Sequence, residues 1–131
     1  MEKFLFITCL TPKSHLTDLR AELHKKYLDA LLKQTNKNWL VFLLGEEEKT
    51  DGNLNYIKCS SKTKEDKLLE IFKKLKTLPV KPEFIIRLDD DDLISEDILE
   101  RVEAHENEFD VFTDIYQSMF DVYSGKSLVK D

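Results

Sequence analysis

Apolar residues follow two different spacings along the chain, and these spacings predict the order of strands and helices. Three stretches are nearly continuous runs of apolar, strand-favouring residues, at 3–10, 39–44 and 84–88. Such runs are typical of strands that are buried on both faces of a parallel sheet. A shorter run at 54–59 predicts one more strand, and the polar residues 49–53 before it predict a turn.

Two longer segments carry apolar residues every three or four positions, which predicts amphipathic helices. The first extends from about Thr17 to Gln34, with Thr17 or Asp18 as the N-cap. The second begins at Thr63–Asp66, which resembles a capping box with aspartate at its last position. Pro79 ends this helix, because proline cannot continue it.

The last third of the chain predicts a short helix and several short strands. Ser95 is a favourable N-cap, and the acidic residues after it suit the first turn of a helix. A short strand is predicted at 110–113. The strand-like residues 115–123 and 127–129 are separated by a turn at Gly125 and predict a hairpin.

This order of elements predicts a single α/β domain over residues 1–131, with a mostly parallel sheet and helices on both faces. In open sheets of this kind, ligands bind outside the carboxyl ends of the strands. Polar residues gather at three such ends, namely Thr11–Pro12, Gly45–Glu47 and Asp89–Asp92. We therefore expect the functional site at this edge of the sheet.

Four consecutive aspartates, Asp89–Asp92, stand directly after the apolar run 84–88. Aspartate is unfavourable in strands, and adjacent negative charges repel one another. A bound divalent cation would stabilise them, and carboxylate oxygens suit Mg²⁺, Mn²⁺ or Ca²⁺. The alternative interpretation is a solvated acidic turn that caps the next helix. The position at the tip of a predicted core strand favours a metal site.

Composition narrows the class of partner and the compartment. The net charge is −6, and four of the 26 acidic residues form the aspartate run, so the remaining surface is nearly balanced. No basic stripe with interleaved aromatic residues points to a nucleic-acid partner. The apolar run 4–10 is too short for a signal peptide or a membrane span. We expect a cytoplasmic protein, with attachment to the inner membrane face through a partner left open.

A divalent ion held by carboxylates in an α/β domain usually meets a phosphate, whose oxygens fill the open metal positions. The chain has three glycines and neither a Walker loop nor a dinucleotide-binding fingerprint. The metal would therefore carry most of the phosphate binding, helped by a cation such as Arg87 or Lys13.

Two segments resemble the GT-A glycosyltransferases of family 2. Leu31–Trp39, with the sequence LLKQTNKNW, resembles the end of that family's first helix and the corner before its second strand. Phe84–Asp92, with the sequence FIIRLDDDD, resembles the strand that ends in the family's DXD motif. Its Arg-Leu-Asp-x-Asp-Asp form is most similar to rhamnosyltransferase-type members, which are associated with bacterial surface polysaccharides.

The resemblance implies a truncated GT-A fold, with a Rossmann-like, mostly parallel sheet flanked by helices. It implies transfer of a sugar from a nucleoside diphosphate donor to an acceptor hydroxyl on a glycan or a lipid-linked molecule, with Mn²⁺ or Mg²⁺ as cofactor. The implied metal ligands are Asp89, Asp91 and Asp92, with the frame Asp90 and Asp92 as an alternative. The implied nucleotide-sugar contacts are Thr11, Pro12, Glu46, Arg87, Asp89 and Asp90.

The chain departs from the family pattern in two places. Gly45–Glu48 stands where the family usually has Asp-Asp-Gly-Ser near the nucleobase. The family's domain also normally continues into a part that carries the acceptor site and the general base. A general base must lie within hydrogen-bond reach of the acceptor hydroxyl, and no catalytic residue is assigned here.

Other functions stay open at this point. A nucleotide-sugar-binding fragment without turnover fits the same residues. In a phosphatase, Asp89 would be the nucleophile and Asp91 the acid–base, although Leu93 stands where that class has threonine or valine. A calcium loop would use Asp89, Asp91 and Glu100, although Ile94 replaces its glycine. Exposed sheet edges would permit a homo-oligomer.

Overall fold

The structure is a computed structural model that describes residues 1–108, 117–120 and 127–130. The chain forms two compact units, Met1–Glu100 and Arg101–Asp131. Within the described residues, every helix is too short or too polar to cross a membrane.

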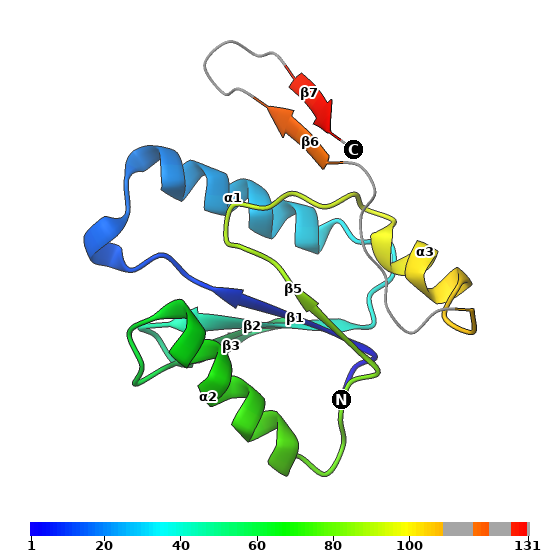
Figure 1. Ribbon diagram of the computed structural model, residues 1–131, viewed down its shortest axis with the longest axis horizontal. Coiled ribbons are helices and arrows are strands. Elements are labelled where there is room, and N and C mark those ends of the chain that lie inside the picture. The colour runs from blue at the N-terminus through cyan, green and yellow to red at the C-terminus, as the bar shows by residue number, and fades with distance from the viewer. Residues whose placement is uncertain (109–116, 121–126, 131) are drawn as a thin grey trace. The chain divides into compact units, whose positions relative to one another are not determined.

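The first unit is built on a five-stranded mixed sheet (Figure 1). Its strands are β1 (Phe4–Cys9), β2 (Trp39–Gly45), β3 (Lys49–Asp51), β4 (Leu54–Lys58) and β5 (Phe84–Arg87). The spatial order is β3-β4-β2-β1-β5, and all neighbours are parallel except the pair β3–β4. The predicted α/β class is therefore confirmed, with a sheet that is mixed at one edge.

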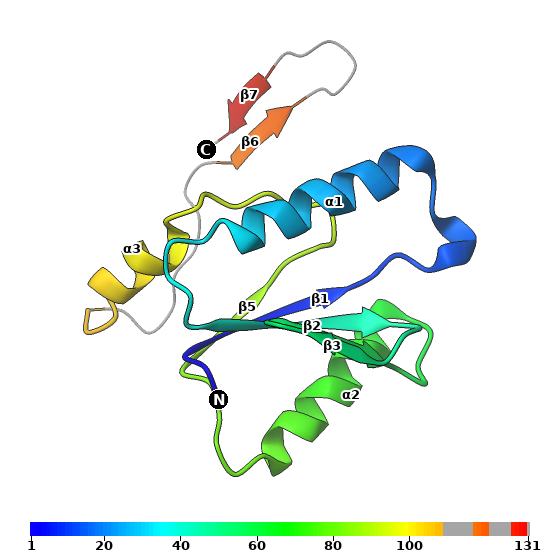
Figure 2. The same ribbon diagram turned by 180° about the vertical axis from the view of Figure 1, so that it is seen from behind.

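Helices lie on both faces of this sheet (Figures 1 and 2). α1 (Asp18–Leu32) covers one face and α2 (Lys64–Thr77) covers the other. A short 3₁₀ turn, η1 (Lys13–His15), precedes α1, and α3 (Ile98–Ala104) follows β5. The sheet is thus the middle of three layers, which is the arrangement expected when helices connect parallel strands.

The two long helices begin where the sequence predicts, because threonine side chains cap them. Thr17 accepts a hydrogen bond from the backbone N–H of Arg20, and Thr63 accepts one from Asp66. Each bond satisfies an N–H group that the helix itself leaves unpaired and stabilises the helix by about 1 kcal/mol. α2 ends just before Pro79, as predicted.

β1 and β2 form the buried centre of the unit. The side chains of Phe4–Thr8 are at most 1% exposed. Leu5 and Ile7 pack against Ile71 and Leu75 of α2, and the residues between them point to the opposite face. Full burial of one such apolar side chain stabilises the fold by roughly 1.5–3 kcal/mol. The predicted burial of β1 on both faces is therefore confirmed.

β5 differs from the prediction of a buried core strand. It lies at an edge of the sheet and pairs with β1 alone among the described strands. Its residues alternate between half-buried and exposed, and Ile85 is 47% exposed. An apolar run has the same appearance in a central strand and in an edge strand, because sequence pattern does not report how many neighbours a strand has.

The segment 49–53 is a strand and a tight turn, where the sequence predicted a turn alone. β3 pairs antiparallel with β4, with Asp51 opposite Leu54. Gly52 has a φ of 57°, a conformation that favours glycine. The three residues of β3 are polar and exposed, so this strand lacks the apolar alternation that would have revealed it.

The start of α3 also differs from the prediction. The helix begins at Ile98, and Ser95 contributes its backbone carbonyl, which accepts a hydrogen bond from the Ile98 N–H at 3.3 Å. The same carbonyl accepts a bond from the Gln34 side chain at 2.7 Å. Ser95 therefore belongs to a loop that is fastened to the end of α1, and the predicted serine N-cap is wrong.

The described residues of the second unit include an antiparallel hairpin of β6 (Gln117–Phe120) and β7 (Ser127–Lys130). The predicted hairpin is confirmed in these residues. The predicted strand at 110–113, the remainder of 115–123 and the turn at Gly125 lie outside the described residues.

Candidate functional site

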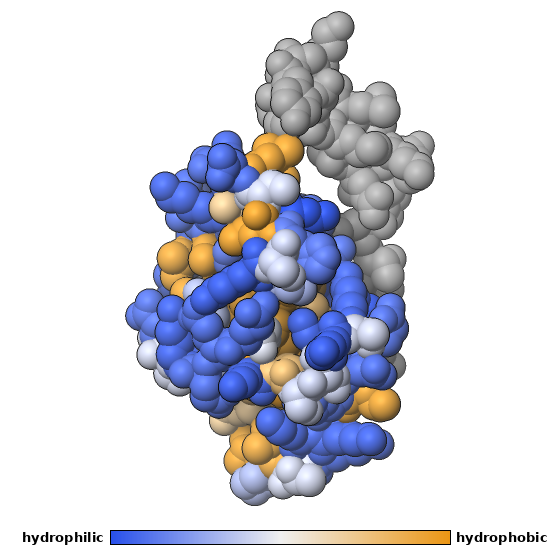
Figure 3. Space-filling model, turned by 90° about the vertical axis from the view of Figure 1, so that its left-hand side faces the viewer, coloured by the Kyte–Doolittle hydropathy of each residue, from blue (hydrophilic) through white to orange (hydrophobic). Residues whose placement is uncertain are grey.

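The carboxyl ends of β1, β2 and β5 lie at one edge of the sheet, because these strands are parallel and adjacent or separated by one strand. Figure 3 views the molecule from the side where β1 and β2 end, and hydrophilic residues cover most of that face. The polar segments predicted to meet at this edge do so, since a hydrogen bond joins Thr11 to Asp90 and another joins Lys13 to Glu46.

A pocket of about 150 Å³ opens at this edge. Four of the six predicted nucleotide contacts line it, namely Thr11, Pro12, Glu46 and Asp90. The structure thus brings these four residues to one pocket and leaves Arg87 and Asp89 outside its lining. The pocket is also lined by His24 of α1, Tyr56 of β4 and Lys67 of α2, which had not been predicted.

Asp90 is held firmly by the loop after β1. Its carboxylate oxygen Oδ2 accepts hydrogen bonds from the backbone N–H and from the hydroxyl of Thr11, both at 2.7 Å. The backbone oxygen of Asp90 lies 3.2 Å from Nδ1 of His24, whose ring stacks on Tyr27 at a centroid distance of 5.6 Å. The aspartate run is therefore attached to both β1 and α1 through its second residue.

The other three aspartates form a separate cluster. Asp89, Asp91 and Asp92 each place one carboxylate oxygen within 4.8 Å of the others, and all three side chains are exposed. A tight turn brings them together, because the Asp89 N–H donates to the Asp92 carboxylate at 2.8 Å and the Asp92 N–H donates to the Asp89 carbonyl at 3.1 Å. These are the three residues that the resemblance implied as metal ligands.

The donor set of this cluster suits a hard cation. Three carboxylates offer only oxygen, which Mg²⁺ and Mn²⁺ prefer and which leaves positions for phosphate or water. The ammonium of Lys64 at present bonds to the Asp89 carboxylate, and this hydrogen bond raises the pKa of Lys64. Exposed acidic groups also lie close together in proteins that bind no ion. The cluster is a candidate metal site because its three carboxylates supply the oxygen ligands that these ions prefer.

The glutamates after β2 mainly fasten loops. Glu46 accepts a hydrogen bond from the Lys13 backbone at 3.1 Å. Glu47 pairs with the ammonium groups of Lys13 and Lys49, both at 3.2 Å, and these contacts lower the pKa of Glu47. Glu48 accepts from the Lys58 N–H at 2.7 Å. Glu46 is the member of this run that both lines the pocket and was predicted as a contact.

Arg87 lies apart from the pocket. It is exposed on β5, opposite Ile7 in the register, and therefore on the sheet face that α2 covers. It is close enough to Lys64 to oppose protonation of that ammonium, since its charge acts to lower the pKa of Lys64. Arg87 therefore does not line the pocket with Thr11, Pro12, Glu46 and Asp90.

Lys67 was not predicted as a site residue, although its position in the sequence is unusual for a lysine. It occupies the apolar stripe of α2, four and eight positions before the buried Ile71 and Leu75. A lysine in such a stripe was a signal, because residues four apart share one face of a helix. Lys67 is 7% exposed.

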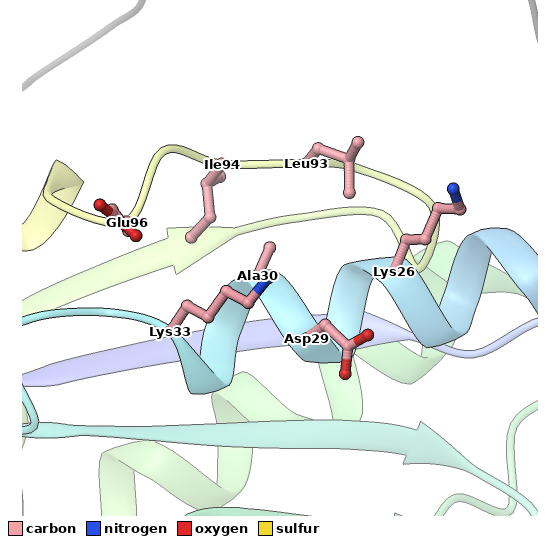
Figure 4. Close-up of a pocket in the computed structure, with 7 residues that line it drawn as sticks. All are labelled: Lys26, Asp29, Ala30, Lys33, Leu93, Ile94 and Glu96. Carbon is pink, nitrogen blue, oxygen red and sulfur yellow. The ribbon is translucent and has the colours of Figure 1, made fainter.

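A larger hollow of about 460 Å³ lies between α1 and the loop 93–96. Lys26 and Lys33 of α1 stand on one side of it, and Leu93, Ile94 and Glu96 line the other side (Figure 4). None of the predicted site residues lines this groove. The smaller pocket is therefore the stronger candidate, because Glu46 and Asp90, which are held by hydrogen bonds, line it.

Comparison with known proteins gives no family for this chain. No protein-family model matches it, and no curated protein matches it.

Proposed function

We propose that the chain binds a nucleoside diphosphate sugar together with Mn²⁺ or Mg²⁺ and transfers the sugar to an acceptor hydroxyl on a glycan or a lipid-linked molecule. One observation carries this proposal: the aspartate run contributes to two adjacent features. Asp90 lines the pocket, while Asp89, Asp91 and Asp92 gather their carboxylates. A ligand with an organic part and a diphosphate would match that pair of features.

The chemistry of the cluster supports the diphosphate. A divalent ion on exposed carboxylates keeps coordination positions that phosphate oxygens can fill. When the bond between sugar and phosphate breaks, negative charge builds on the leaving diphosphate, and a metal ion there stabilises it. The chain's own part is to hold the carboxylates in one turn and to fasten that turn through Asp90.

The first segment that resembles the GT-A family, Leu31–Trp39, is bonded to the loop that follows the second segment, Phe84–Asp92. Gln34, which is fully buried, donates to the Ser95 carbonyl at 2.7 Å, and the Thr35 N–H donates to the Glu96 carbonyl at 2.8 Å. The corner after α1 therefore fixes the loop that follows the aspartate run. This contact supports our proposal that the α/β domain has a GT-A fold.

Calorimetry with UDP, GDP, dTDP, CDP and ADP, each with and without Mn²⁺, tests the proposal. We expect binding that requires Mn²⁺ and that Asp91→Asn abolishes. Asp51→Asn is the matched control, because Asp51 is an exposed aspartate on β3, and it should bind as the parent chain does. Failure of every nucleotide to bind, with and without Mn²⁺, would overturn the proposal.

A second candidate function is nucleotide-sugar binding without turnover. The acidic residues that line the pocket are engaged in other contacts: Asp90 with Thr11, Glu46 with the Lys13 backbone and Glu47 with Lys13. Among the described residues, the pocket therefore presents no unengaged carboxylate to act as a general base. Nucleotide binding without sugar transfer or donor hydrolysis would favour this candidate, and hydrolysis of a simple phosphomonoester would favour a phosphatase.

A further inference from the structure

Lys67 is a charged side chain in an apolar position. It is 7% exposed and lies on the face of α2 that packs against the sheet. Burial of an ammonium group is costly unless hydrogen bonds or an opposite charge compensate it. A lysine at such a position therefore requires an explanation beyond packing.

The Lys67 ammonium has no protein partner in the part of the chain that the structure describes. No carboxylate oxygen lies within 4.0 Å of it there, and no hydrogen bond reaches it. The Lys67 ammonium nitrogen is nevertheless still accessible to solvent. Among the described residues, the side-chain atoms that are both fully buried and without a hydrogen-bond partner are Gln34 Oε1 and Trp39 Nε1, and Lys67 is not one of them. Because Lys67 lines the 150 Å³ pocket, its ammonium has the pocket as its route to a partner.

The surroundings of Lys67 suit a flat, neutral ring better than a phosphate. Leu10, Pro12 and Tyr56 contribute apolar and aromatic surface to the pocket. Glu46 and Asp90 line it as well, and their negative charges would repel a phosphate group. A metal ion on the neighbouring aspartate cluster would bind the phosphates more favourably. The pocket would then hold the nucleobase.

We propose that Lys67 selects the nucleobase of the donor by donating a hydrogen bond to a keto oxygen. This inference rests on the proposed function. Uracil, thymine and guanine carry a keto oxygen on the ring edge where cytosine and adenine carry an amino group. An amino group would face the ammonium donor to donor, and both groups would stay unpaired. The site therefore prefers UDP, dTDP or GDP over CDP and ADP.

Calorimetry in the presence of Mn²⁺ tests this selection. For the parent chain we expect the keto-bearing diphosphates to bind about 10- to 100-fold more tightly than CDP and ADP, the range that one hydrogen bond to a charged group gives. Lys67→Met should weaken UDP, dTDP and GDP to the level of the other two. Lys73→Met, on the exposed side of α2, is the control and should leave all five affinities unchanged.

Lys67→Gln provides a second variant, because its amide can accept as well as donate a hydrogen bond. Lys67→Gln should reduce the difference in affinity between the keto-bearing diphosphates and CDP or ADP, or reverse it in favour of CDP and ADP. The absence of a keto preference in the parent chain, or its persistence in Lys67→Met, would overturn the inference and leave the proposed function intact. Equal weakening of Mn²⁺–pyrophosphate binding by Lys67→Met would place Lys67 at the phosphates and also overturn it. If the parent chain binds no nucleotide, the proposed function itself fails.

Discussion

A buried hydrogen bond joins α1 to the centre of the sheet beneath the candidate site, and its contribution to stability can be worked out. Oη of Tyr27 and Oγ1 of Thr8 are 2.5 Å apart, and these residues are 1% and 0% exposed. The Tyr27 ring stacks on His24, which reaches the backbone of Asp90. The perturbations are Thr8→Val, Tyr27→Phe and the double variant.

Each single variant leaves one buried hydroxyl without its partner. The loss of a hydrogen bond together with the desolvation of the orphaned group amounts to about 2 kcal/mol. The double variant removes both hydroxyls, so no orphan remains, and we expect a total cost of about 1–2 kcal/mol. The sum of the two single costs should therefore exceed the double cost, with a coupling energy of about 2–3 kcal/mol.

Urea unfolding measures these free energies. Trp39 is the only tryptophan and is 1% exposed, so its fluorescence reports the loss of the core of the first unit. The four proteins should share one m-value and differ in midpoint, because the exposed surface on unfolding is nearly the same. Single costs that add up to the double cost would show that the two hydroxyls are not coupled, and the reasoning would be wrong.

Three further predictions test other contacts. Lys64→Gln should bind Mn²⁺ several-fold more tightly in calorimetry, because the ammonium that competes for Asp89 is removed; weaker binding would contradict the assignment of the cluster. Cys9 and Cys59 should react slowly with a thiol reagent at pH 8 and rapidly in urea, because burial raises the pKa of both thiols, that of Cys59 to about 11; equal native and unfolded rates would refute this. Thr63→Ala should lower the urea-unfolding free energy by about 1 kcal/mol through the lost cap, and an unchanged midpoint would refute the capping role.

Local signals in the sequence were enough to predict the elements whose causes are local. β1 is a run of residues that prefer strands and are apolar on both faces, and both of its faces are covered. α1 and α2 start at threonines whose side chains bond to N–H groups three residues later. The residues that determine such a strand or helix start lie within a few positions of it, so they can be recognised in a single sequence.

Features that depend on neighbours distant in the chain could not be predicted in the same way. The edge position of β5 depends on which strand pairs with it. Thr11 was predicted as a nucleotide contact, but its two bonds to Asp90, 79 residues away, show a fastening role that no local pattern reveals. Lys67 was visible as a charge in an apolar stripe, yet its meaning depends on a pocket formed by residues from several elements.

The four aspartates are not equivalent, and this changes the argument for a metal. Their repulsion first indicated that a cation was needed to stabilise them. In the folded chain Asp90 is bonded to Thr11, Asp92 accepts a backbone N–H, and Asp89 accepts the Lys64 ammonium. The exposed charges also lie in water, where two unit charges 4 Å apart interact by only about 1 kcal/mol. These contacts hold Asp89, Asp90 and Asp92 in one turn, so we expect a metal that binds there to meet carboxylates that the chain itself already positions.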